Sequence, residues 1–289
     1  MDEKLSEEPD LRAAIEAELR AAGELADEEL NIGGVALALA QWDNPGKDRT
    51  PYLTELEALT DAVRESLVKA EAPGADMIAM VLANIISGRF SYRGDTETYD
   101  DPKNADLMAV IDRRKGLPVS LGILYLHVGR ALGLDLAGLN FPGHFILRLQ
   151  AGPEATIIDP FNRGQTLTTA DLLNLLRSIE GQQARLIPEH HVSVSPRDIL
   201  LRLQNNILSR ALGAGEYDRA RDVVSRMIWF APDRAGLQFE LGRIEIHAGH
   251  MGAAASAFEA CRNMASDAGD RRVADMASEA LKRLKAKLN

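Results

Sequence analysis

The stretch that decides the fold runs from Gly116 to Asp159 and reads GLPVSLGILYLHVGRALGLDLAGLNFPGHFILRLQAGPEATIID. Its first part is apolar at helical spacing as far as Leu132, which predicts a helix. Pro118 suits the first position of that helix, because its missing N–H needs no partner there and its φ is already helical. The segment after the helix changes period, so this stretch predicts a domain that combines helix and sheet.

The second part of the stretch predicts a β-hairpin. Apolar and polar residues alternate from His144 onward, which is the period of a strand. Gly152-Pro153 interrupts the pattern, and a second strand ends at Asp159. A turn centred between residues 151 and 152 sets His144 directly opposite Asp159, with Cβ atoms about 4.5–5.5 Å apart. We therefore expect a ring nitrogen of His144 within hydrogen-bond distance of the Asp159 carboxylate.

Helical patterns flank this stretch on both sides. They predict a helical N-terminal region over residues 1–95, a core over 96–192 and paired helices with a terminal helix over 193–289. Similar residues in the last region recur at a spacing of 34, which is the period of a tetratricopeptide repeat. The pairs with this spacing are Gly215 and Gly249, Ala220 and Ala254, and Ile207 and Leu241.

The composition of the chain limits which partners it can bind and in which cellular compartment we expect it. The formal net charge of -10 and the pI near 5.2 argue against a nucleic-acid partner, because phosphate binding needs clustered Lys and Arg. The single cysteine, Cys261, cannot form an intramolecular disulfide. The N-terminus lacks the pattern of an ordinary signal peptide, and the longest apolar run, 32–40, is too short to span a bilayer. We expect a cytoplasmic protein with no membrane partner.

The order of a helix, a His strand and an Asp strand resembles the core of the transglutaminase-like superfamily. In that family a Cys at the helix N-terminus is the nucleophile, the His takes its proton and the Asp orients the His. Three motifs narrow the resemblance to the SirB-one-type branch, whose bacterial members combine a helical N-terminal region, a degenerate core and C-terminal tetratricopeptide repeats. These motifs are Tyr99-Asp100-Asp101-Pro102-Lys103-Asn104, the run from Arg113 to Leu121, and Phe141-Pro142-Gly143-His144-Phe145.

The resemblance covers most of residues 30–265 and implies an α+β, mostly helical fold. It consists of a helical N-terminal region, a transglutaminase-like core with a small antiparallel sheet, and C-terminal tetratricopeptide-like helical pairs. Family members begin the helix Gly-x-Cys and end it Leu-Gly, as Gly116-Leu117-Pro118 and Leu132-Gly133 do here apart from the Cys. The resemblance therefore places Pro118 at the nucleophile position. Proline supplies neither a nucleophile nor a backbone N–H for an oxyanion.

Three polar residues keep alternative interpretations open. Ser120 is the obvious substitute nucleophile, although its position in the first helical turn also suits a hydroxyl that satisfies an orphan amide, which we favour. His144 with Asp159 is a remnant catalytic dyad, a polar pocket that binds a ligand, or a clamp that satisfies a partly buried imidazole.

We predict a non-catalytic, cytoplasmic interaction protein whose repeats bind a protein or peptide. The alternative is a hydrolase or acyltransferase that uses Ser120 with His144 and Asp159. In tetratricopeptide repeats the first helix of each pair lines a concave groove, which the core or the terminal helix could also fill. The resemblance carries five binding positions over to this chain: Arg202, Asn205, Phe239, Arg243 and His247.

We expect neither a cofactor nor a metal. His190-His191 is the one histidine pair that suggests a metal. Adjacent histidines on a strand point to opposite faces, and no second ligand pair lies at helical spacing. These residues are therefore predicted to be exposed linker.

Overall fold

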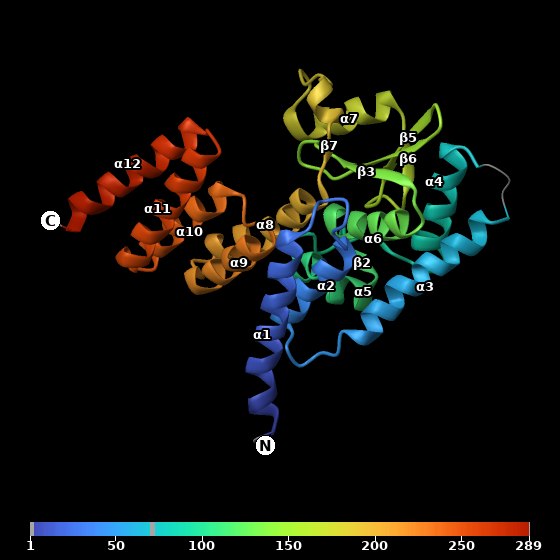
Figure 1. Ribbon diagram of the computed structural model, residues 1–289. Coiled ribbons are helices and arrows are strands. Elements are labelled where there is room, and N and C mark those ends of the chain that lie inside the picture. Colours follow the sequence, from blue (N-terminus) through green and yellow to red (C-terminus); the bar gives the residue numbers. More distant parts are fainter. Residues whose placement is uncertain (1–2, 70–72, 289) are drawn as a thin grey trace. The chain divides into compact units, whose positions relative to one another are not determined.

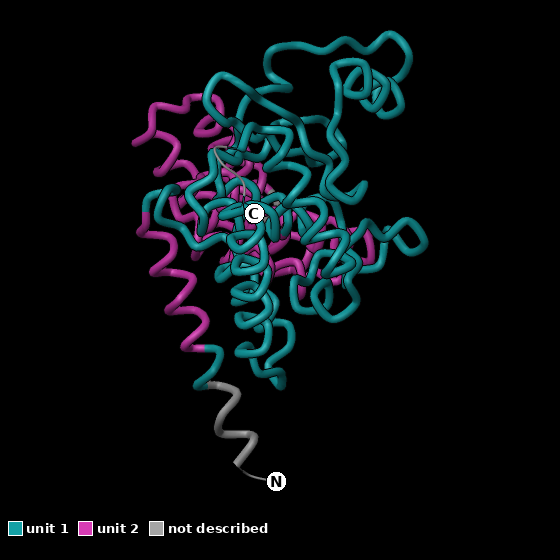
Figure 2. Tube along the Cα trace, turned by 90° about the vertical axis from the view of Figure 1, so that its right-hand side faces the viewer, with its two compact units in different colours: residues 1–12, 26–203 teal, residues 13–25, 204–289 magenta. Residues whose placement is uncertain are grey.

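The chain divides into two compact units. The computed structural model describes residues 3–69 and 73–288. The core unit comprises residues 1–12 and 26–203, and the repeat unit comprises residues 13–25 and 204–289 (Figure 2). Within the described residues, no helix combines the length and the apolar character needed to cross a membrane. The fold is α+β and mostly helical, as the sequence predicts.

Helices make up most of the core unit (Figure 1). Pro118 begins α6, whose N-cap is Leu117 in an extended conformation. All but three residues of α6 are buried, so this helix forms the centre of the unit's core. The helical elements are α2 (Ile32–Asp43), α3 (Thr50–Leu67), α4 (Ala75–Ala83), a π-helix (Asn84–Arg89), a 3-10 helix (Pro102–Ala105), α5 (Leu107–Arg113), α6 (Pro118–Ala131), α7 (Thr169–Glu180) and a 3-10 helix (Pro188–His191). The helix α1 (Glu3–Glu24) contributes residues to both units.

A five-stranded antiparallel sheet lies between α6 and α7 (Figure 1). Leu136 contacts Gly129 of α6 through one face. Leu139 and Ile157 pack with Leu172 and Leu176 of α7 on the other. The spatial order of the strands is β6 (Gln165–Leu167), β5 (Glu154–Asp159), β4 (Leu147–Ala151), β3 (Asp135–Leu139) and β7 (Ser193–Val194).

Phe145 fills the space between the sheet and α6. Its side chain is 1% exposed. A Cβ placed on Gly122 of α6 would lie 2.3 Å from the ring, and one on Gly138 of β3 would lie 2.6 Å from it. Both glycines are therefore required for close approach to the ring, not for a special backbone angle.

A second, two-stranded parallel sheet joins β1 (Arg93–Gly94) to β2 (Lys115–Gly116). Arg93 pairs with Lys115 in the register of this sheet. The backbone N–H of Gly94 also donates to the carbonyl of Phe161 at 2.9 Å, which ties β1 to the turn that follows β5.

The repeat unit is built from paired helices. Gly215 (φ 72), Gly249 (φ 84) and Gly269 (φ 75) lie in three connecting turns, where their positive φ lets the chain reverse in a few residues. Small residues also sit where helices cross, since a Cβ on Gly242 would lie 2.7 Å from the Phe258 ring. The helices are α8 (Pro196–Gly213), whose first part belongs to the core unit, α9 (Tyr217–Phe230), α10 (Ala235–His247), α11 (Met251–Asp267) and α12 (Arg271–Leu288).

Candidate functional site

His144 and Asp159 form the hydrogen-bonded pair that the sequence predicts. The Nε2 atom of His144 lies 3.0 Å from Oδ1 of Asp159. Their side chains are 11% and 1% exposed, so the pair is almost entirely shielded from solvent. His144 also lies edge-on to the ring of Phe161, with centroids 5.9 Å apart. The expected contact is confirmed.

The predicted register of the hairpin is wrong by two residues. Leu147 pairs with Ile158, and Ala151 pairs with Glu154. Gly152 and Pro153 thus form the two-residue turn, and Gly152 adopts a φ of 57 that glycine tolerates best. A shift of two keeps every side chain on its predicted face. His144 precedes β4 instead of lying on it, and the loop it occupies still brings it to Asp159.

Asp159 also fixes the turn between β5 and β6. Its Oδ1 accepts the backbone N–H groups of Phe161 at 3.0 Å and Asn162 at 3.2 Å. Its Oδ2 accepts the side-chain amide of Asn162 at 2.6 Å. Burial raises the pKa of the Asp159 carboxyl, but the hydrogen bonds from His144 and Asn162 outweigh burial and leave that pKa below its ordinary value.

The backbone of His144 is held by Arg202, which the resemblance to tetratricopeptide repeats places in a ligand groove. Arg202 lies in the core unit, and its Nη2 donates to the His144 carbonyl at 2.6 Å. Its guanidinium lies over the Phe145 ring, 5.5 Å from the ring centroid. Burial lowers the pKa of Arg202. Arg202 therefore stabilises the His144 loop, a role that nothing in the local sequence indicated.

Pro118, which the resemblance aligns with the family's nucleophile, is buried. Pro118 occupies the first turn of α6 as predicted. Ser120 is 0% exposed, and its hydroxyl donates to the carbonyls of Asn104 at 2.8 Å and Leu117 at 3.1 Å. The prediction that Ser120 satisfies an orphan amide is wrong in its partner, because the hydroxyl bonds carbonyl oxygens. Its proton is engaged with the backbone.

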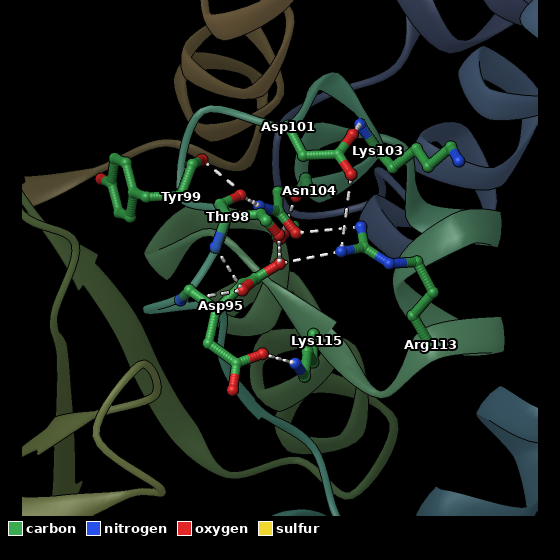
Figure 3. Close-up of polar contacts among 10 residues, drawn as sticks. Asp95, Thr98, Tyr99, Asp101, Lys103, Asn104, Arg113 and Lys115 are labelled. Atoms are coloured by element: carbon green, nitrogen blue, oxygen red, sulfur yellow. Dashed lines mark hydrogen bonds and ion pairs between the residues drawn. The ribbon is translucent and has the colours of Figure 1, made fainter.

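An ion-pair network joins the loop after β1 to the 3-10 helix Pro102–Ala105 and to the end of α5 (Figure 3). Asp95 is 0% exposed, and its carboxylate accepts from Arg113 at 2.8 Å and from the Thr98 hydroxyl at 2.7 Å. Arg113 also donates to the Asn104 amide oxygen at 3.1 Å. Burial raises the pKa of Asp95, but the hydrogen bonds from Thr98 and Asn104 outweigh it and hold that pKa well below its usual range.

The binding positions implied by the repeats lie in different surroundings. Phe239 and Arg243, on α10, line one groove of the repeat unit. His247 stacks on Tyr217, with parallel rings 5.2 Å apart. Asn205 is exposed on α8.

The two adjacent histidines are not both exposed. His190 is 8% exposed and packs edge-on against Phe141, whereas His191 is exposed. Since both lie in a 3-10 helix, the strand argument does not apply, and the prediction of exposed linker is wrong for His190. In the part of the chain that the structure describes, no group of three or more His, Cys, Asp or Glu residues is arranged to hold a metal ion.

The sequence of each unit matches a known protein family. Residues 50–205 match the transglutaminase-like superfamily, and residues 207–282 match a tetratricopeptide repeat. The chain belongs to the transglutaminase-like superfamily. The superfamily match spans His144, Asp159 and the loop that carries Asp95, so these residues lie in the transglutaminase-like core.

Several proteins are similar to this chain in sequence or in fold. A UPF0162 protein of Xylella fastidiosa is 29% identical over 78% of this chain and 80% of the relative. A UPF0162 protein of Pseudomonas aeruginosa is 32% identical over 75% of this chain and 81% of the relative. Human F-box only protein 21 is 30% identical over 57% of this chain and 27% of its own length. The crystal structure of menin aligns with a TM-score of 0.40 at 11% identity, covering 89% of this chain and 70% of the menin chain.

Replacing Asp159 by Asn is expected to lower the free energy of unfolding by about 1.5–3 kcal/mol at neutral pH, because charge-assisted hydrogen bonds become neutral ones. The pKa of Asp159 is lower in the folded state, so its contribution is present above the unfolded pKa near 4 and is lost as the pH falls through the folded value. Urea unfolding across the acid range should show a weaker pH dependence for Asp159→Asn than for the wild type. Asp135→Asn, an exposed change at the start of β3, is the control. An undiminished acid dependence in Asp159→Asn contradicts this assignment.

Proposed function

We propose that this protein is a non-catalytic transglutaminase-like protein that acts in the cytoplasm as a protein-interaction module through its tetratricopeptide repeats. The observation that carries the non-catalytic part is the state of Ser120, which is fully buried with its hydroxyl donated to the Asn104 carbonyl at 2.8 Å. A nucleophilic hydroxyl must instead donate to a general base and face a substrate.

The remaining nucleophile candidates support the same conclusion. Pro118 offers no reactive group and no N–H for an oxyanion. Cys261 is 0% exposed within α11, and burial raises the pKa of its thiol, which disfavours the reactive thiolate. His144 and Asp159 are then a clamp that joins the loop before β4 to the end of β5.

The groove of the repeat unit supports the interaction part of the proposal. It has a volume of about 660 Å³ between α10, α11 and α12. Phe239, Phe258 and Met276 give it an apolar lining, and Met276 is 44% exposed. Arg243 and Arg283 border it, but each is paired on its own helix, with Glu240 at 2.9 Å and Glu279 at 3.0 Å. This arrangement suits a partner segment that inserts an apolar side chain.

The non-catalytic proposal is tested with a fluorophosphonate probe, which labels activated serine hydroxyls. The wild-type protein is expected to label no more than Ser120→Ala and His144→Ala do. Labelling of the wild type that is lost in both variants supports the alternative, a hydrolase or acyltransferase that uses Ser120 with His144 and Asp159.

The interaction proposal is tested with Met276→Glu, which places a charge in the apolar groove without removing a buried side chain. Proteins that the wild type captures from native extract are expected to be lost when the bait carries this change, because the charge must be desolvated on binding. Met80→Glu, at a 53% exposed methionine of α4, is the matched control and should retain them. If both baits capture the same proteins as the wild type, the groove is not the binding surface.

A further inference from the structure

A second pocket, in the core unit, is polar and carries an excess of positive charge. It has a volume of about 340 Å³. Its charged lining consists of Arg93, Lys115, Arg163 and Glu97. Phe161 and Asn162, which contact His144 and Asp159 as described above, form part of its wall. The pocket therefore adjoins the degenerate transglutaminase-like site and is separate from the groove in the repeat unit.

Two of the cations are held side by side. Arg93 and Lys115 are register partners in the parallel β1–β2 ladder, so their side chains start from the same face of neighbouring strands. Like charges in this position repel each other. The ladder is fixed at both ends, because Arg93 N–H donates to Arg114 O at 3.1 Å and Asp95 N–H donates to Gly116 O at 3.1 Å.

The third cation comes from the turn that Asp159 organises. Arg163 follows Phe161 and Asn162, whose N–H groups bind the Asp159 carboxylate. Its φ of 58 lies in the left-handed region, so the turn sets the direction of this residue at some conformational cost. No hydrogen bond or ion pair links the Arg163 side chain to another of the described residues.

The carboxylate of Glu97 neutralises only part of the positive charge of the pocket. Lys115 pairs with Glu97 at 2.6 Å, and this hydrogen bond lowers the pKa of the Glu97 carboxyl. The Glu97 side chain is 77% exposed, so it can move aside at little cost. Three cations and one carboxylate leave an excess of two positive charges, in a chain whose net charge is -10. Thr96 and Gln165 add neutral hydrogen-bonding groups to the lining.

We propose that this pocket binds the oxyanion group of a small molecule, either a phosphate or a carboxylate. Two guanidiniums and an ammonium around one cavity offer several charge-assisted hydrogen bonds to such a group. The planar guanidinium of Arg can also bind two oxygens of a phosphate or carboxylate at once. A bound oxyanion relieves the repulsion between Arg93 and Lys115. The degenerate core would then retain a ligand site although it lacks the family's nucleophile.

The proposal is tested by calorimetric titration of the full-length protein at constant ionic strength. The probes are inorganic phosphate, pyrophosphate and malonate, and chloride is the comparator. At least one probe is expected to bind saturably with one-to-one stoichiometry, while chloride does not. Binding by phosphate or pyrophosphate alone identifies a phosphate site, and binding by malonate alone identifies a carboxylate site.

Four variants separate a built site from general surface charge. Arg93→Gln and Arg163→Asn should each weaken the bound probe by about tenfold or more, and Asn tolerates the left-handed φ at position 163. Arg185→Gln removes an exposed cation outside the pocket and should leave affinity unchanged. Glu97→Gln should tighten binding roughly two- to fivefold, because it removes the competing carboxylate. A structural role alone would not produce that gain.

Two results would overturn the proposal. One is the absence of saturable binding by all three probes together with an unchanged melting temperature in their presence, since a ligand of the folded state must raise it. The other is an equal loss of affinity in Arg163→Asn and Arg185→Gln, which would assign the binding to net charge. Melting temperatures of the variants without ligand verify that each is folded.

Discussion

Replacing Phe145 by Ala is expected to lower the free energy of unfolding by about 3–5 kcal/mol, the range for removing a fully buried aromatic side chain. The ring fills the space that Gly122 and Gly138 leave open, and its loss creates a cavity that two glycines cannot close. The substitution also removes the surface on which Arg202 lies, 5.5 Å from the ring centroid. Urea unfolding of the full-length protein gives the loss, and hydrogen exchange of the α6 amides assigns it to the core unit.

The reciprocal change tests the same contact from the other side. Gly122→Ala, which ordinarily favours a helix, is expected to destabilise the protein by about 1–3 kcal/mol, because the new Cβ meets the Phe145 ring. Phe145→Leu in the same chain should recover part of this loss, so the two changes are not additive. Gly252→Ala, in α11 with no atom near its Cβ position, is the control and should change stability little or raise it. Additive losses would show that Gly122 and Phe145 are not coupled.

The helix start and the His144–Asp159 pair were predictable because local patterns set them. Pro118 has a fixed φ that suits a first helical position, and the alternating periods bring both polar residues to one end of a hairpin. The register was not predictable to the residue, since it depends on which position of the turn Gly152 takes. Gly152, with a φ of 57, begins the turn one position later than the predicted centre implies.

The sequence did not predict the roles of residues whose partners lie far away along the chain. Arg202 binds the His144 carbonyl across 58 positions of sequence, and its place in a predicted repeat pointed to a ligand groove. Asp95 and Arg113 are 18 positions apart. Charged residues in loops and at helix ends are usually exposed, so sequence alone favours solvation for both. A weak local signal existed for Asp95, because Asp followed three residues later by Thr can form a turn closed by its own side chain.

Arg113→Met is expected to lower the free energy of unfolding by about 3–5 kcal/mol, the range for breaking a buried ion pair by removing one partner. The change leaves the fully buried carboxylate of Asp95 without its cation (Figure 3). It also removes the hydrogen bond to the Asn104 side chain, and the Asn104 carbonyl is the group that Ser120 and the Leu117 N–H bind at the start of α6. Hydrogen exchange in the first turn of α6 should therefore accelerate along with the global loss.

The decisive control is a second change that removes the stranded charge. Asp95→Asn in the Arg113→Met background should recover part of the stability, because the Asn oxygen still accepts the Thr98 N–H at the position where Asp95 Oδ1 now does, at 3.0 Å. Arg113→Lys keeps the charge but cannot bind Asp95 and Asn104 through two separate nitrogens. Its free energy of unfolding should therefore lie between those of Arg113→Met and the wild type. If Asp95→Asn deepens the loss of Arg113→Met, the cost comes from packing of the arginine stem and not from an uncompensated buried carboxylate. Partial recovery instead assigns the cost to the uncompensated Asp95 carboxylate, and the faster exchange in α6 then follows from the lost contact between Arg113 and Asn104.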